Sequence, residues 1–418
     1  MKLSMIVIFS ILLGGCASFG KGIAEAVMDN QTKHDTRICE VRGTPFSGIE
    51  PYLSNNNGRM KLLMVHGVGR HMPGYSTQFR EKLGHQMGLT VQARKPKEIL
   101  LTDPEDTGKN LGTLEVHRLL DEANTRELLF YELTWSPITE EDKKVLSYDN
   151  SGKYSYRRAH VNDLMKQFSN DTSPDPMIYL GNKREDILTA FQQSFCWMIK
   201  AYWDDLPTGT KESCNLLTNE AVRNLENDKL AIVSHSLGSR ITIDAMQNIA
   251  QKIGSIAASK QATSIESRFI EEFRSRKLPL FMLSNQLPLL QLGRTLPEVV
   301  GQKEAYCKPE GEHFGQRTLT KTELIAFSDP NDLLSYAIPE GFTSKYLDSR
   351  LCIEVTNVII NVAEVMDLFG IGKVANPLTA HIGYDSDDRV VALIARGIGT
   401  PHTSPLVKQR CTWTRLID

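Results

Sequence analysis

A buried strand that turns directly into a helix is the feature that most constrains the fold of this chain of 418 residues. An apolar run at 230–233 leads into the turn Ser-His-Ser-Leu-Gly at 234–238, and a helical stretch follows. Such a turn pushes the hydroxyl of Ser236 out of the backbone and leaves the next N–H, that of Leu237, free to stabilise an oxyanion. The turn therefore predicts a nucleophile at Ser236.

Strand and helix patterns alternate along most of the chain. A hairpin is expected at 112–134, and the longer helices at 75–87, 184–204 and 389–396. The remaining strands are predicted at 61–65, 278–284, 324–327 and 353–362. This alternation predicts an α/β fold with a mostly parallel central sheet covered by helices on both faces. In such sheets the active site lies at the carboxyl ends of the strands.

The sequence His-Gly-Val-Gly at 66–69 directly follows the first of these strands. A glycine-rich turn after a strand is a weak motif alone, but this one stands about 170 residues before Ser236, as an oxyanion loop would. Together with the turn around Ser236 and the order serine, acid, histidine, it makes residues 60–400 resemble a lipase-like or esterase-like serine hydrolase of the α/β-hydrolase superfamily. The resemblance implies an α/β-hydrolase fold and hydrolysis of carboxylic esters without cofactor or metal.

The resemblance assigns the remaining catalytic roles. His381, in a predicted loop between the last strand and a helix, is expected as the base. Asp329 and Asp332 both follow the strand at 324–327. Asp332 precedes an apolar pair, as the acid of this superfamily does, and is preferred; Asp329, before a proline, suits a turn and remains the alternative. The other histidines near these motifs, at 66, 71 and 235, are expected to shape and pack the site.

The oxyanion hole is expected to consist of the backbone N–H groups of Val68 and Leu237. One position departs from the superfamily pattern, because Ser234 stands two residues before the nucleophile, where glycine is usual. Serine is small enough for this crowded position, so the departure concerns packing more than chemistry.

The N-terminal residues 1–15 are predicted to be a lipoprotein signal peptide. A basic start precedes a short apolar run at 5–13, and Leu-Gly-Gly-Cys at 13–16 resembles the bacterial lipobox, which places a lipid anchor on Cys16. Ala17 follows the cysteine, which by the sorting rule of Gram-negative lipoproteins favours the outer membrane. An ordinary signal peptide is the alternative. Residues 16–58 are then expected to be a tether and entry segment, and 59–418 the hydrolase domain with insertions near 137–183, 252–277 and 291–321.

Cysteine count and charge limit the other possibilities. Six cysteines remain besides Cys16, an even number that permits up to three disulfides in an oxidising periplasm, and Cys196–Cys214 is the preferred local pair. Buried free thiols are the alternative. The sequence contains no Cys-x-x-Cys pair, so it gives no support for a zinc site. A net charge of −2 gives no indication of a nucleic-acid partner.

The expected function is therefore hydrolysis of lipid or other acyl esters through an acyl-enzyme, by a protein held at the membrane through Cys16. Two alternatives remain open. The leaving group is not encoded in the triad, so a thioesterase, amidase or peptidase would use the same residues. A catalytically silent lipoprotein that acts in binding or scaffolding would keep the fold while its insertions block access to Ser236.

Overall fold

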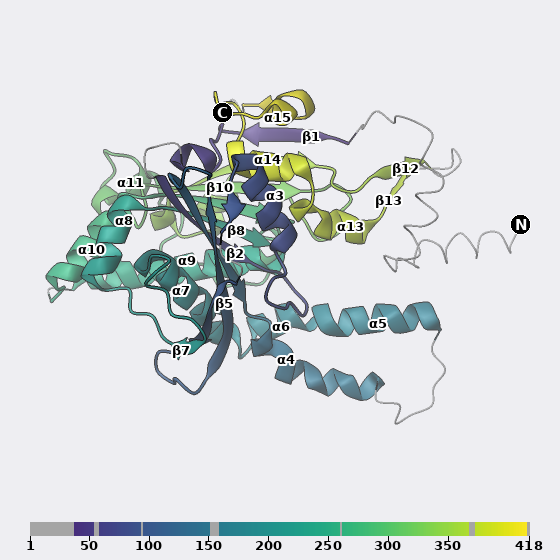
Figure 1. Ribbon diagram of the computed structural model, residues 1–418, viewed down its shortest axis with the longest axis horizontal. Helices are drawn as coiled ribbons and strands as arrows, with labels where there is room; N and C mark the ends of the chain where they lie inside the picture. Colours follow the sequence, from purple (N-terminus) through teal and green to yellow (C-terminus); the bar gives the residue numbers. More distant parts are fainter. Residues whose placement is uncertain are drawn as a thin grey trace, which may run out of the picture.

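The computed structural model describes residues 37–53, 58–92, 95–150, 159–259, 261–367 and 373–415, and a 12-stranded sheet runs through it (Figure 1). The predicted signal peptide and Cys16 lie outside the described residues. The strand order is β14-β1-β11-β10-β9-β8-β2-β6-β5-β4-β7, with β3 paired to β5. The strands are β1 (Cys39–Gly43), β2 (Gly58–Val65), β3 (Thr90–Val91), β4 (Lys97–Thr102), β5 (Asn110–Leu120), β6 (Arg126–Thr134), β7 (Thr210–Glu212), β8 (Lys229–His235), β9 (Lys277–Leu283), β10 (Lys321–Ser328), β11 (Ile353–Ile360) and β14 (Thr412–Thr414).

The centre of the sheet is parallel. Strands β6, β2, β8, β9, β10 and β11 pair in parallel, while β5, β4 and β1 add antiparallel pairs toward the two sides. The prediction of an α/β fold with a mostly parallel sheet is confirmed, as is the hairpin of β5 and β6. The carboxyl ends of the six parallel strands meet at one edge of the sheet, which we call the carboxyl edge.

Alternate residues of the central strands enter two separate cores, because each face of the sheet is covered by helices. Leu63 of β2 and Ile232 of β8 pack on one face with α7 and α9, whereas Leu62 and Val233 pack on the other with α3 and α14. The helices are α3 (Thr77–Met87), α4 (Pro137–Lys143), α5 (His160–Thr172), α6 (Pro174–Leu180), α7 (Arg184–Lys200), α8 (Asn219–Asn227), α9 (Leu237–Ala258), α10 (Ser264–Arg274), α11 (Lys303–Cys307), α12 (Phe342–Tyr346), α13 (Pro377–Ile382), α14 (Asp388–Arg396) and α15 (Pro405–Arg410).

The three segments predicted as insertions differ from one another in secondary structure. Residues 137–183, expected as an insertion, hold α4, α5 and α6, which follow the carboxyl end of β6. Residues 252–277 hold the end of α9 and all of α10, whose N-terminus is a capping box formed by Thr263 and Glu266. Residues 291–321 are largely irregular around α11. Among the described residues, no helix combines the length and the apolar character that a membrane span needs.

Three disulfides join Cys39 to Cys411, Cys196 to Cys214 and Cys307 to Cys352. The predicted Cys196–Cys214 pair is therefore confirmed. The disulfide between Cys39 and Cys411 joins the first residue of β1 to the residue before β14, and these two strands pair at one side of the sheet. Residues 39–43, predicted to belong to a tether, form β1 and are an integral part of the sheet.

Candidate active site

Ser236 occupies a sharp turn between β8 and α9. Its backbone angles, φ 55° and ψ −123°, are rare for a residue other than glycine, and its amide donates a hydrogen bond to the Leu283 carbonyl at 2.9 Å. The turn also needs Gly238, because a Cβ there would lie 2.6 Å from the carbonyl oxygens of Val65 and His66. The start of α9 therefore packs closely against the end of β2, and the turn places Ser236 at the carboxyl edge.

The three residues predicted as a triad come together at this edge. His381 Nε2 lies 3.1 Å from Ser236 Oγ, and His381 Nδ1 lies 2.9 Å and 3.1 Å from the two carboxylate oxygens of Asp332. Since the carboxylate can only accept, Nδ1 carries the proton and Nε2 keeps its lone pair toward the serine. This is the geometry in which an imidazole can remove a proton from a hydroxyl.

Asp332 is buried and remains a carboxylate. Burial alone would raise the pKa of Asp332, but hydrogen bonds from His381, from the Ser284 hydroxyl and from the Leu334 amide outweigh it, so the pKa lies below its ordinary value. A carboxylate held in this state fixes the tautomer of His381 and could stabilise an imidazolium if the imidazole took up a proton.

His381 lies in the last turn of the short helix α13, so the prediction of a loop at this position was wrong. The helix forms because Pro377 occupies its first turn and the Asn376 side chain accepts from the amides of Leu378 and Thr379. His235 Nε2 donates to the His381 carbonyl at 2.8 Å. Burial, followed by repulsion from His381, lowers the pKa of His235 to about 3, which keeps its imidazole neutral in this role.

The sequence interpretation missed Ser284, which directly follows β9. Its hydroxyl donates to Asp332 Oδ2 at 2.7 Å and lies 2.9 Å from His381 Nδ1. Its φ of 50° places it in the left-handed region, between the Leu283 carbonyl that binds the Ser236 amide and the Asn285 amide that binds the Phe327 carbonyl. A buried serine at the end of a strand is common, and only its left-handed backbone and distant partners reveal the role.

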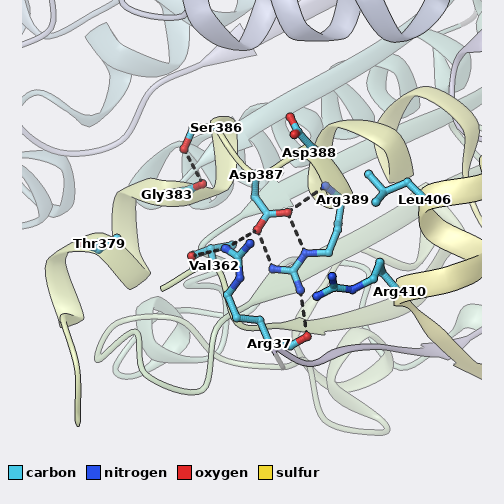
Figure 2. A pocket seen from close by; sticks show the side chains of 10 residues that line it. All are labelled: Arg37, Val362, Thr379, Gly383, Ser386, Asp387, Asp388, Arg389, Leu406 and Arg410. Carbon is cyan, nitrogen blue, oxygen red and sulfur yellow. Dashed lines mark hydrogen bonds and ion pairs between the residues drawn. The ribbon is translucent and has the colours of Figure 1, made fainter. Parts of the chain in front are cut away.

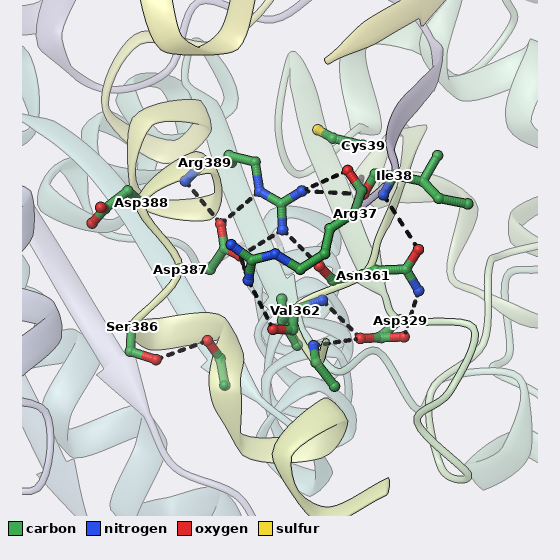
Figure 3. A network of polar contacts seen from close by, with 12 residues as sticks. Arg37, Ile38, Cys39, Asp329, Asn361, Val362, Ser386, Asp387, Asp388 and Arg389 are labelled. Carbon is green, nitrogen blue, oxygen red and sulfur yellow. Dashed lines mark hydrogen bonds and ion pairs between the residues drawn. The ribbon is translucent and has the colours of Figure 1, made fainter. Parts of the chain in front are cut away.

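Among the described residues, Asp329, the alternative acid, has no hydrogen bond to His381, and its contacts hold two loops together. Its oxygens accept from the amides of Val362 and Ala363 and from the side-chain amide of Asn361 (Figure 3). They also accept from the backbone and side-chain amides of Asn331. Every one of these donors belongs to the turn after β10 or to the segment after β11. The arrangement gives Asp329 a structural role at the edge that carries Asp332.

The loop at 66–69 lies directly against the nucleophile. A Cβ on Gly67 would approach the Ser236 Cβ to 2.7 Å, so only glycine allows this contact. In the described part of the chain, the amides of Val68 and Leu237 donate to no other residue, whereas those of Gly69 and Arg70 are bound by carboxylates. The two predicted oxyanion donors are therefore among the amides that this loop and the helix start leave available.

His66 shapes the loop. Its Nδ1 donates to the Gly67 carbonyl at 2.8 Å, its Nε2 accepts from the Trp135 amide at 3.1 Å, and its ring stacks on the Trp135 indole. Burial lowers the pKa of His66 well below its ordinary value, so the imidazole stays neutral, as this donor and acceptor pattern requires. Asp175 of α6 fixes the loop from the other side, since it accepts from the Gly69 amide at 2.7 Å and pairs with Lys143 of α4.

A separate pocket of about 290 Å³ is lined by residues of α13, α14 and α15 (Figure 2). Arg37, Asp387 and Arg389 lie at its wall, and no residue of the Ser236 site lines it. Arg37 binds the Val362 carbonyl and Asp387, and Arg389 pairs with the same carboxylate. These contacts fix the beginning of the described chain to the segments around β11. Within the described ranges, no cluster of three or more histidine, cysteine or acidic side chains is arranged to hold a metal ion.

Comparisons with known proteins identify no relative: no family model, no curated protein and no solved structure matches this chain significantly.

Proposed function

We propose that this protein is a serine hydrolase of the α/β-hydrolase type that cleaves carboxylic esters, of lipids or other acyl compounds, through an acyl-enzyme on Ser236. The observation that carries the proposal is the continuous relay from Ser236 Oγ to His381 Nε2, at 3.1 Å, and from His381 Nδ1 to Asp332, at 2.9 Å. The relay starts at a serine in a strained turn, which is how a hydroxyl is presented to a substrate.

The reaction proceeds in two halves. Ser236 Oγ bonds to the ester carbonyl carbon while its proton moves to His381 Nε2, and the amides of Leu237 and Val68 stabilise the oxyanion. When the intermediate collapses, the carbon–oxygen bond to the alcohol breaks and the alcohol leaves with the proton from Nε2. Water then attacks the acyl-enzyme, gives one proton to Nε2, and releases the carboxylic acid as Ser236 regains that proton. Each oxyanion donor is worth about 3 kcal/mol of barrier in a dry site.

The setting of the reaction is part of the same proposal. The sequence at 13–16 supports a lipid anchor on Cys16, and Ala17 after it favours the outer membrane. The serine-type site supports an acyl substrate, so the enzyme would act on acyl compounds at that membrane. No metal or organic cofactor takes part in the proposed steps, since the protein supplies nucleophile, base, acid and oxyanion donors itself.

Labelling with a fluorophosphonate probe tests the proposal. Wild-type protein is expected to be modified, and Ser236→Ala is not. Ser335→Ala is the matched control, because the Ser335 hydroxyl contacts the Asp329 carbonyl and Tyr384 but neither His381 nor Asp332, so this variant should keep its labelling. Labelling of Ser236→Ala, or none of the wild type, would overturn the assignment. Hydrolysis of esters of graded acyl length, with a thioester, an amide and a phospholipid in the same series, then defines the substrate.

A further inference from the structure

The large apolar side chains that remain exposed are concentrated at the carboxyl edge. Except for Ile38, Val91, Leu296 and Trp413, all of them in the described chain lie in segments that leave the carboxyl ends of β2, β6, β9, β10 and β11. Ile38 lies at this edge as well, because β1 runs antiparallel to β11. An apolar surface gathered on one side of a protein marks a place where it meets a membrane or another protein.

These side chains stand on separate projections around the Ser236 site. Phe168 on α5 is 56% exposed and Met366 on β12 (Val365–Asp367) is also 56% exposed, while Leu333, next to Asp332, is 74% exposed. Helices α5 and α13 and the pair of β12 with β13 (Lys373–Ala375) extend toward the same side of the sheet (Figure 1). Apolar tips that surround a site without forming one groove suit a deformable lipid surface better than a preformed protein partner.

The chain also enters the fold at this edge. Cys39 of β1 pairs with Ile360, the last residue of β11, and Arg37 is bound to the Val362 carbonyl and to Asp387. In the sequence, Cys16 precedes Arg37 by 21 residues. That length of chain spans at most about 70 Å when fully extended. A lipid on Cys16 would thus tether the molecule by the same edge that carries its exposed apolar side chains.

We propose that the carboxyl edge docks on the lipid bilayer that carries the Cys16 anchor, so that the Ser236 site faces that membrane and takes its substrate from it. The entry of the chain at Arg37 and the exposed apolar side chains are independent observations that select the same face. The inference rests on the proposed function for its substrate and for the anchor, while the docking itself can be measured without catalysis.

Lipid quenching of a site-specific fluorophore is the direct test. With Cys16 lipidated and the other six cysteines paired, an added cysteine is the one thiol available for labelling. The full chain carrying Phe168→Cys, Met366→Cys or Val91→Cys is labelled and reconstituted in vesicles of phosphatidylethanolamine and phosphatidylglycerol that contain a nitroxide lipid. Val91, which is 39% exposed and pairs with Leu119 near the opposite edge, is the control.

Quenching of at least twofold at positions 168 and 366, with none at 91, is expected. Equal quenching at the three positions, or none at 168 and 366, overturns the docking, and a dimer seen by light scattering together with unquenched labels assigns the face to a second copy instead. Repeating the measurement on Ser236→Ala separates this outcome from any failure of the proposed chemistry, because docking needs no turnover.

A charged variant connects docking to substrate access. The double variant Phe168→Asp/Met366→Asp is expected to hydrolyse phospholipid in vesicles at least tenfold more slowly than wild type, while a soluble short-chain ester is hydrolysed within twofold. Val91→Asp should change neither rate. An equal loss on both substrates, or no loss on vesicles, contradicts the proposal.

Discussion

Asp332 and Asp329 leave the same strand three residues apart, and both are buried, yet their surroundings differ in kind. Asp332 accepts from a side chain that can change its protonation, His381, and from the mobile proton of the Ser284 hydroxyl. Asp329 accepts mainly from backbone and side-chain amides, which never titrate. The first environment can respond to charge that develops during a reaction, whereas the second can only hold loops in place.

One residue, Tyr384, contacts both aspartates. The Tyr384 hydroxyl accepts from the Asp329 amide at 2.6 Å and lies 3.4 Å from Asp332 Oδ2. Burial, then the nearby charge of Asp332, raises the pKa of Tyr384 well above its ordinary value, so the phenol keeps its proton. The comparison therefore predicts that substitution of Asp332 lowers the rate of hydrolysis, whereas substitution of Asp329 lowers the stability of the fold.

Asp332→Asn is expected to have the largest effect, a loss in kcat of about 10⁴-fold, because an amide cannot hold the tautomer of His381 that the relay needs. The free energy of unfolding should change little. Asp329→Asn is the matched comparison and should keep kcat within about tenfold of wild type. Steady-state hydrolysis of a soluble ester measures both variants. A greater loss of kcat at Asp329 would reverse the assignment of the acid.

Asp329→Ala is expected to lower the free energy of unfolding by roughly 3 kcal/mol, since its removal leaves several buried N–H donors without an acceptor. Denaturant unfolding with the disulfides intact measures the change. Asn331→Ala removes a single partner of the same carboxylate and should cost about a third as much. If Asp329→Ala unfolds like wild type, the loops after β10 and β11 are held by other contacts.

Sequence patterns could predict the parts of this site that depend on local order. Ser236 and the loop at 66–69 follow apolar strands, and the acid and His381 follow later ones. The short apolar runs and their alternation with helices were therefore enough to place these residues at one edge. The same reasoning could not separate Asp329 from Asp332 by physical means, because their distinction lies in contacts with residues 361–363 and 381, far along the chain.

The rest of the architecture depends on pairings that leave no local trace. β1 joins the sheet through β11 and through the disulfide between Cys39 and Cys411, which are 372 residues apart. Ser284 meets Asp332 and His381 only because β9 lies between β8 and β10. An isolated serine after a strand carries no pattern, and neither does a five-residue strand in a polar segment.

Ser284→Ala is expected to lower kcat by about tenfold, a smaller loss than that expected for Asp332→Asn. Without this donor the pKa of Asp332 rises, so the acidic limb of the kcat profile, which the coupled pair of Asp332 and His381 sets, should shift, a change that a merely structural role would not produce. Ser335→Ala is the control, because the Ser335 hydroxyl contacts the Asp329 carbonyl and Tyr384 but neither His381 nor Asp332. An unchanged pH profile for Ser284→Ala would remove Ser284 from the relay.

The pH dependence of stability gives the smallest expected effect. The folded pKa of Asp332 lies below the ordinary value of 3.8, so its stabilising contribution is complete above that value and is lost as the pH falls through the folded pKa. The difference in free energy of unfolding between wild type and Asp332→Asn should therefore shift against the wild type between about pH 4 and pH 2, and stay constant above about pH 5. In Ser284→Ala the same loss should be smaller and should be complete at a higher pH, because Asp332 keeps fewer of the hydrogen bonds that lower its folded pKa. Denaturant titrations of the three proteins at matched ionic strength measure these differences, and a difference that stays constant down to about pH 2 would mean that Asp332 titrates alike in the folded and unfolded chains.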